Sequence, residues 1–212
     1  MTSAVIVDYG IGNILSVRRA LEYCGAEVTL ATKPSEILDA DHLVLPGVGA
    51  FRDGIAGLKK NGLDEAVLRY AETGRALLGI CLGMQMLATN SHEFGTHRGL
   101  DIIPGDVIAI PKIAANGQSH KIPYIGWAPL EETQPGSFQD TPLKAIMPGE
   151  YVYLVHSFHV EPTNPADKIA CYDYDGIGVT AAVRHGNIFG CQFHPEKSGP
   201  VGLRIVATFL GA

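Results

Sequence analysis

Short apolar segments alternate with amphipathic segments through the first 89 residues, and this alternation limits the possible folds more than any other feature. The apolar segments, read as strands, are Ala4–Val7, Val28–Leu30, His42–Leu45 and Ala76–Ile80. Strands that are apolar on both faces are typical of parallel sheets covered by helices on both sides. The pattern therefore predicts an α/β fold with a doubly wound parallel sheet.

The segments between these strands have helical periodicity. Asn13–Tyr23 reads as a helix whose inner face would carry Ile14, Leu15, Val17 and Leu21, and Gly25 follows as a stop. Phe51–Gly74 predicts one or two helices, and Leu82–Thr89 predicts another.

The pattern of residue types changes from about Gly99, where prolines become frequent and helical periodicity disappears. Tyr151–Val155, Ile169–Tyr172 and Ile188–Phe193 read as strands, partly antiparallel, and Val201–Leu210 reads as a closing helix. No repeat or interdomain linker is present. We therefore expect one domain over 1–212, with a mostly parallel, flavodoxin-like central sheet flanked by helices and a partly antiparallel region in the C-terminal half.

Composition excludes several functional classes. The net charge is −6 and no cluster of Lys and Arg stands out, so we expect no nucleic-acid partner. The first ten residues, MTSAVIVDYG, have no basic n-region and no long apolar stretch, so we expect no signal peptide. No apolar run of about 18 residues occurs, so we expect no membrane span. The four cysteines are scattered without a CxxC pair, which favours free thiols in a cytoplasmic protein and argues against a metal site. We expect no cofactor.

The stretch Gly79-Ile80-Cys81-Leu82-Gly83 lies where a predicted strand meets a predicted helix. A sharp strand-to-helix turn crowds the backbone, and glycines two positions before and two after its tip relieve that crowding. The tip residue, Cys81, would lie at the carboxyl edge of the sheet beside a helix N-terminus, which favours a thiolate nucleophile. The amide of Leu82 would then face an oxyanion. A buried core cysteine between incidental glycines is an equal alternative at this point.

Two further motifs offer partners for such a nucleophile. His194 and Glu196 follow a predicted strand and flank Pro195. On extended backbone a spacing of two puts both side chains on the same side, as a base and the group that orients it. Pro46-Gly47-Val48-Gly49 also follows a strand, and its glycines would expose the amide of Val48 as the second half of an oxyanion hole. Taken separately, each motif is more often an ordinary turn, and only the combination with the cysteine turn favours a catalytic role.

Together these motifs resemble a known family. GICLGMQ (79–85), PGVGAF (46–51) and FHPEKS (193–198) resemble the class I (triad) glutamine amidotransferases. The match extends along nearly the whole chain. DYGIGN (8–13), GLDIIPGDV (99–107) and YVYLVHSF (151–158) make it most similar to the glutaminase subunits of imidazole glycerol phosphate synthase.

This resemblance implies hydrolysis of L-glutamine to glutamate and ammonia through a cysteinyl thioester. It implies that Cys81 is the nucleophile, His194 the base and acid, and Glu196 the orienting group. The amides of Val48 and Leu82 match the oxyanion positions. The positions that match those holding the substrate are Gly49, Gln85 and the backbone of Ser157 and Phe158.

The resemblance also implies a partner, a separate (β/α)₈ cyclase subunit that would form a heterodimer with this chain. The cyclase would use the ammonia to make imidazole glycerol phosphate and an aminoimidazole carboxamide ribotide in histidine biosynthesis. Asn13, Trp127 and Lys197 match positions facing that subunit. Three alternatives stay open: another class I amidotransferase (anthranilate, pyridoxal phosphate or nucleotide synthesis), a cysteine peptidase-like hydrolase, and a catalytically silent flavodoxin-like module.

Overall fold

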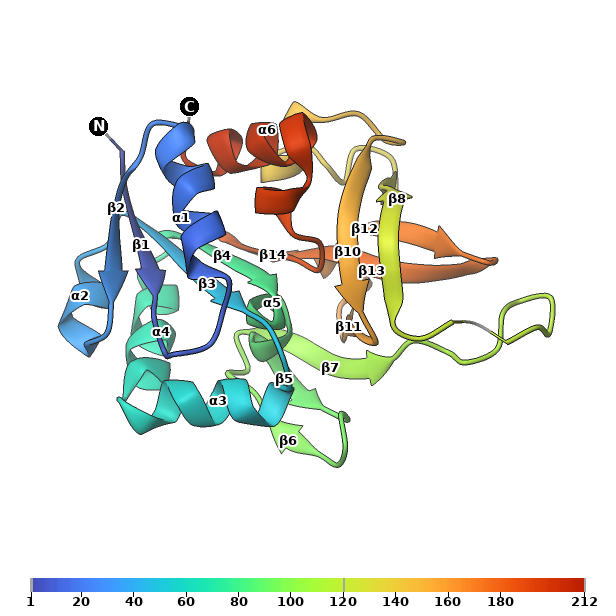
Figure 1. Ribbon diagram of the computed structural model, residues 1–212, viewed down its shortest axis with the longest axis horizontal. Coiled ribbons are helices and arrows are strands. Elements are labelled where there is room, and N and C mark those ends of the chain that lie inside the picture. The colour runs from blue at the N-terminus through green and yellow to red at the C-terminus, as the bar shows by residue number, and fades with distance from the viewer. Residues whose placement is uncertain (1, 120, 212) are drawn as a thin grey trace.

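The fold is built on one large sheet. The computed structural model describes residues 2–119 and 121–211. Within them, eight strands form a sheet in the order β2-β1-β3-β4-β14-β13-β12-β9 (Figure 1). The first five strands are parallel, and the last three pair antiparallel. Their bounds are β1 Ser3–Val7, β2 Glu27–Ala31, β3 His42–Gly47, β4 Ala76–Cys81, β14 Ile188–Cys191, β13 Ile177–His185, β12 Lys168–Tyr174 and β9 Glu131–Glu132.

Helices cover both faces of the parallel part. α1 and α6 lie on one side of the sheet, and α3 and α4 lie on the other (Figure 1). The helices are α1 Ile14–Tyr23, α2 Pro34–Leu38, α3 Phe51–Lys60, α4 Leu63–Glu72, α5 Leu82–Met86 and α6 Gly199–Phe209. None of them is long and apolar enough to cross a membrane, as judged over the described residues.

Alternate residues of each parallel strand belong to two different cores. Val44 and Leu78 pack in the cluster under α1 and α6, whereas Leu43 and Leu77 pack in the cluster under α3 and α4. A strand in this position buries both of its faces, so it must be apolar throughout. The doubly wound α/β class predicted from the apolar segments is confirmed.

Two smaller sheets extend the C-terminal half beyond the large one. One has the strand order β11-β7-β5-β6, and the other pairs β10 with β8. Their bounds are β5 Ala88–Ser91, β6 His97–Arg98, β7 Ile103–Ala109, β8 Tyr124–Pro129, β10 Tyr151–His156 and β11 Phe158–Pro162. Three short 3₁₀ helices lie in the later connections: η1 Pro142–Ala145 and η2 Pro165–Asp167 between strands, and η3 Pro195–Lys197 between β14 and α6.

The predicted helix Leu82–Thr89 is wrong in its second half. The helix ends at Met86, and Ala88–Ser91 is the strand β5. The backbone carbonyl of Leu87 accepts from the amide of Ile103, and that of Thr89 accepts from Gly99. Pairing with segments that follow in sequence therefore replaces the next helical turn, and tertiary structure outweighs local helix propensity here.

Candidate active site

Cys81 occupies a strained turn between β4 and α5. Its backbone has φ 54° and ψ −112°, a positive φ that non-glycine residues adopt rarely and at an energetic cost. The flanking glycines make the turn possible. A Cβ at Gly83 would lie 1.8 Å from the carbonyl oxygen of Leu45, and one at Gly79 would lie 2.9 Å from the backbone of Met84. The turn therefore requires glycine at both positions, as the sequence predicts.

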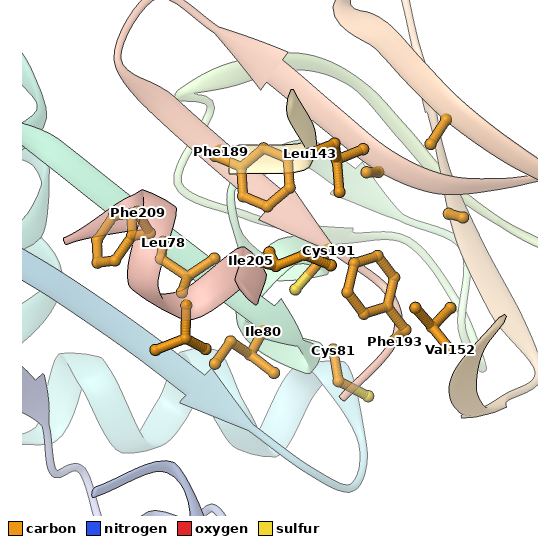
Figure 2. Packing of buried hydrophobic residues seen from close by; sticks show 14 of the residues in the cluster. Leu78, Ile80, Cys81, Leu143, Val152, Phe189, Cys191, Phe193, Ile205 and Phe209 are labelled. Carbon is orange, nitrogen blue, oxygen red and sulfur yellow. The ribbon is translucent and has the colours of Figure 1, made fainter. Parts of the chain in front are cut away.

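Cys81 lies at the carboxyl end of β4, as predicted, but it is well buried there. Its residue exposure is only 8%, and it belongs to a buried cluster that includes Ile80 and Phe193 (Figure 2). The following helix has only five residues, Leu82–Met86, so its dipole is smaller than a helix to Thr89 would supply. The sulfur is thus held by packing at the end of the strand, at the wall of a cavity.

His194 and Glu196 form the predicted contact, but the backbone between them has a different conformation from the predicted one. The Nδ1 atom of His194 lies 2.9 Å from a carboxylate oxygen of Glu196, and the two side chains are 3% and 1% exposed. The backbone between them is not extended, because Pro195–Lys197 is a 3₁₀ helix. A single tight turn therefore brings the carboxylate back to the ring.

The backbone of this turn is tied to strand β10. The amide of His194 donates to the carbonyl of Tyr153. The hydroxyl of Ser198 donates to the carbonyl of His194 and accepts from the amide of Tyr153. Three hydrogen bonds therefore fix where the imidazole stands relative to the sheet, and Ser198 takes part in two of them.

The surroundings of His194 raise the pKa of its imidazole, so the ring is protonated at neutral pH. Burial lowers its pKa, but the neighbouring Cys81 and Glu196 outweigh burial and raise the pKa to about 9. The Nε2 atom is buried and has no well-formed hydrogen bond to any described residue. Cys81 therefore lies close enough to raise the pKa of the ring, without the geometry of a completed hydrogen bond. A buried ring nitrogen without a partner, beside a thiol, suits proton transfer to a reacting group.

One cavity collects most of the predicted site residues. It has a volume of about 300 Å³ and is lined by Val48, Gly49, Cys81, Leu82, Gln85, Glu93, Pro123, Val155, His156, Ser157, Phe158 and His194. These residues come from segments spread along most of the chain. A second cavity, of about 340 Å³, includes residues from the starts of β4 and β14 and the end of α6, and no described cysteine or histidine lines it.

The two predicted oxyanion amides belong to residues of the same cavity wall. Leu82 is the first residue of α5, so its N–H is one of the helix-start donors without an intrahelical partner. Val48 follows β3, and Gly49 beside it has φ +97°, a conformation that favours glycine. The cavity therefore places both segments beside Cys81.

Some hydrogen-bonding groups of the predicted substrate-holding residues are already paired within the protein. The side-chain nitrogen of Gln85 donates to the carbonyl of Phe158 at 3.0 Å and to the side-chain oxygen of Gln192 at 2.9 Å. The carbonyl of Phe158 also accepts from Nδ1 of His156 at 2.8 Å. Two donors fill both lone pairs of that carbonyl. What Gln85 can still offer to a ligand is its side-chain oxygen.

Two titratable residues of the cavity wall, Glu93 and His156, are not among the predicted site residues. Glu93 lines the cavity, and its carboxylate accepts from the amide of Phe51 at the start of α3. His156 is buried, accepts at Nε2 from the hydroxyl of Tyr172, and has a pKa lowered to about 4 mainly by burial. No sequence motif marks either role, because both depend on contacts with distant segments.

The three predicted interface residues lie at or near the surface. Trp127 on β8 is half exposed, and its ring meets Tyr153 edge-on at 5.9 Å between centroids. Lys197 is exposed, and Asn13 is partly exposed at the start of α1. Tyr153 in turn lies 6.5 Å from the ring of His194. One aromatic ring, that of Tyr153, therefore separates the exposed tryptophan from His194, the candidate base.

Comparison with known proteins agrees with this geometry. The family Glutamine amidotransferase class-I matches residues 5–211. The chain is 51% identical over 211 residues to "Imidazole glycerol phosphate synthase subunit HisH 1" of Legionella pneumophila (strain Paris), covering 99% of each chain. It is 44% identical to "Imidazole glycerol phosphate synthase subunit HisH" of Syntrophotalea carbinolica over 206 residues, covering 97% of this chain and 98% of the other.

Solved structures share the fold at lower sequence identity. The PurLQS structure from Thermotoga maritima has a TM-score of 0.71 with 22% identity, and covers 99% of this chain and 98% of that one. The family match spans nearly every residue, and the curated relatives are aligned almost end to end. The chain belongs to the class I glutamine amidotransferase family.

Proposed function

We propose that this protein is the glutaminase subunit of an imidazole glycerol phosphate synthase. It hydrolyses L-glutamine to glutamate and ammonia and supplies the ammonia to a cyclase subunit in histidine biosynthesis. The observation that carries the proposal is a cavity lined by Cys81 and His194, with Glu196 hydrogen-bonded to His194, in a member of the class I glutamine amidotransferases.

The proposed reaction begins with the sulfur of Cys81. Because Cys81 and Glu196 raise the pKa of His194 to about 9, the imidazole carries a proton at neutral pH. The sulfur attacks the amide carbon of glutamine, and the amides of Leu82 and Val48 receive the oxyanion. His194 then gives its proton to the leaving amine, ammonia departs, and a thioester remains.

Water completes the cycle. Neutral His194 accepts a proton from a water molecule as that water attacks the thioester. The C–S bond breaks, glutamate leaves, and the proton returns to the pair formed by His194 and Cys81. Glu196 holds Nδ1 of the ring throughout, so that Nε2 always faces the reacting atoms. In total, glutamine and water become glutamate and ammonia.

The amino-acid end of glutamine would be held by the opposite wall of the cavity. Glu93 supplies a negative charge for the α-ammonium group, and the side-chain oxygen of Gln85 is a second acceptor for it. Gly49 and the backbone at Ser157 complete this wall. The carbonyl of Phe158 takes no part, because Gln85 and His156 already occupy it.

The partner is the (β/α)₈ cyclase subunit, another chain in a cytoplasmic heterodimer. The paired strands β8 and β10 expose three large side chains, Ile125, Trp127 and Tyr151. Of these, Trp127 packs against Tyr153, whose ring centroid lies 6.5 Å from that of His194. Exposed large apolar side chains of this kind suit a protein partner, and Asn13 and Lys197 would add polar contacts to it. The names of the curated relatives favour this assembly over those of anthranilate, pyridoxal phosphate or nucleotide synthesis.

The test is co-purification with a (β/α)₈ cyclase, with glutaminase activity measured in and out of the complex. Trp127→Ala should weaken the complex. Leu68→Ala, an exposed leucine on α4, is the matched control and should leave it intact. A glutamine-mimicking electrophile should label Cys81, and glutamine should protect it. Stoichiometric binding to a different synthase, with no affinity for the cyclase, would support the alternative amidotransferase instead.

A further inference from the structure

A line of buried hydrogen bonds ends on the sulfur of Cys81. Gln192 is fully buried, and its side-chain nitrogen lies 3.6 Å from that sulfur. Its side-chain oxygen accepts from the nitrogen of Gln85. Gln85 donates in addition to the carbonyl of Phe158. Gln192 thus links Gln85 to the sulfur of the proposed nucleophile.

The direction of each hydrogen bond in this line is determined. The carbonyl of Phe158 can only accept, so the end of the Gln85 amide that faces it must be the nitrogen. That nitrogen also faces Gln192, so the end of the Gln192 amide that meets it must be the oxygen. The remaining end of Gln192, which is the N–H donor, must therefore point at the sulfur. Reversing either amide would put two donors or two acceptors together.

We propose that Gln192 is a further catalytic residue, whose side-chain amide donates a hydrogen bond to the sulfur of Cys81 and favours the thiolate over the thiol. The inference rests on the proposed function, in which that sulfur is the nucleophile. A thiolate accepts hydrogen bonds more strongly than a thiol, so a fixed donor stabilises the charged form. Gln85 contributes indirectly, by keeping the amide of Gln192 in the required orientation.

Other groups around the sulfur do not provide the same effect. Burial raises the pKa of Tyr9 and of Cys191, so both stay neutral near pH 7. Burial likewise lowers the pKa of His156 to about 4, which keeps it neutral. The charged neighbours are His194 with Glu196 and, in the wall of the same cavity, Glu93. All of these remain in a Gln192 variant, so a comparison with the wild type isolates the donor.

The experiment measures alkylation of Cys81 by iodoacetamide from pH 5 to 10, with the modified residue mapped by mass spectrometry. Gln192→Met removes the donor at similar volume and should move the midpoint of the pH–rate profile upward by roughly 0.5 to 1 pH unit. Gln85→Met leaves Gln192 in place but frees its amide, so a smaller upward shift is expected. Thr180→Val is the control, because its buried hydroxyl has no described hydrogen-bond partner, and it should leave the profile unchanged.

The outcomes separate this inference from the proposed function. If Gln192→Met is folded by circular dichroism and its profile superimposes on that of the wild type, Gln192 is not a donor to the thiolate. If Gln192→Met does not fold, an unchanged profile in Gln85→Met overturns the inference. If wild-type Cys81 reacts no faster than the partly exposed Cys24 and Cys171, the proposed function itself fails, whatever the Gln192 variants do.

Discussion

Replacing Glu196 by glutamine removes a buried charge while leaving the shape of the site nearly unchanged. One carboxylate oxygen of Glu196 accepts from Nδ1 of His194 at 2.9 Å, and the side chain is 1% exposed. The carbonyl oxygen of a glutamine can accept from the same N–H, so the ring should keep its tautomer. Glu196→Gln therefore tests the charge, whereas His194→Ala removes the proton carrier.

The size of each effect follows from this geometry. A hydrogen bond to a charged acceptor contributes about 1.5–3 kcal/mol and one to a neutral acceptor about 0.5–1.5 kcal/mol, so the loss is about 1–1.5 kcal/mol. That corresponds to a roughly tenfold slower step. Loss of a positioned general base costs on the order of 10²–10⁴ in rate. Glu196→Gln should therefore be the milder change by at least about tenfold.

The assay is the single-turnover rate of thioester formation from glutamine, measured with the cyclase bound. A titration of His194 by NMR accompanies it. Because Glu196 is one of the groups that raise the pKa of His194 to about 9, Glu196→Gln should move that pKa downward. A Glu196→Gln enzyme as slow as His194→Ala, with the His194 pKa unmoved, would refute the assignment of Glu196 as the orienting charge.

Three further changes give sharp outcomes. Cys81→Ala should abolish ammonia release while circular dichroism stays native, and any retained turnover would assign the chemistry to another group. Gly83→Ala should prevent formation of the native turn, measured as lost solubility or lost cooperative unfolding, because its Cβ would lie 1.8 Å from the oxygen of Leu45. Stability to urea should fall as pH drops from 6.5 toward 4. Burial lowers the folded-state pKa of His156 and of His159 from 6.5 to about 4, so the unfolded chain binds more protons in that window. Each histidine should account for about 3 kcal/mol, and a flat stability profile between these pH values would contradict their neutral burial.

Much of the fold could be predicted from local sequence. The apolar runs around Val5, Val44 and Leu78 predict strands buried on both faces, since each residue of such a run enters one of two cores. The sharp strand-to-helix turn at Cys81 can also be predicted from local sequence, because the turn itself requires glycines two residues before and two residues after its tip. Residue type and spacing suffice wherever the physics involves only neighbouring residues.

The rest of the site was decided by tertiary structure. Strand β5 replaces a predicted helical turn because the backbone groups that follow Met86 find partners beyond Gly99. The roles proposed for Glu93 and Gln192 depend on contacts with α3 and with the end of β4, which are far away along the chain. Amide orientation, burial and the pKa of a histidine are set by whichever groups the fold brings together. The sequence determined where a nucleophile could stand, and the assembled fold determined which donors, acceptors and charges surround it, because those interactions depend on distance in space rather than along the chain.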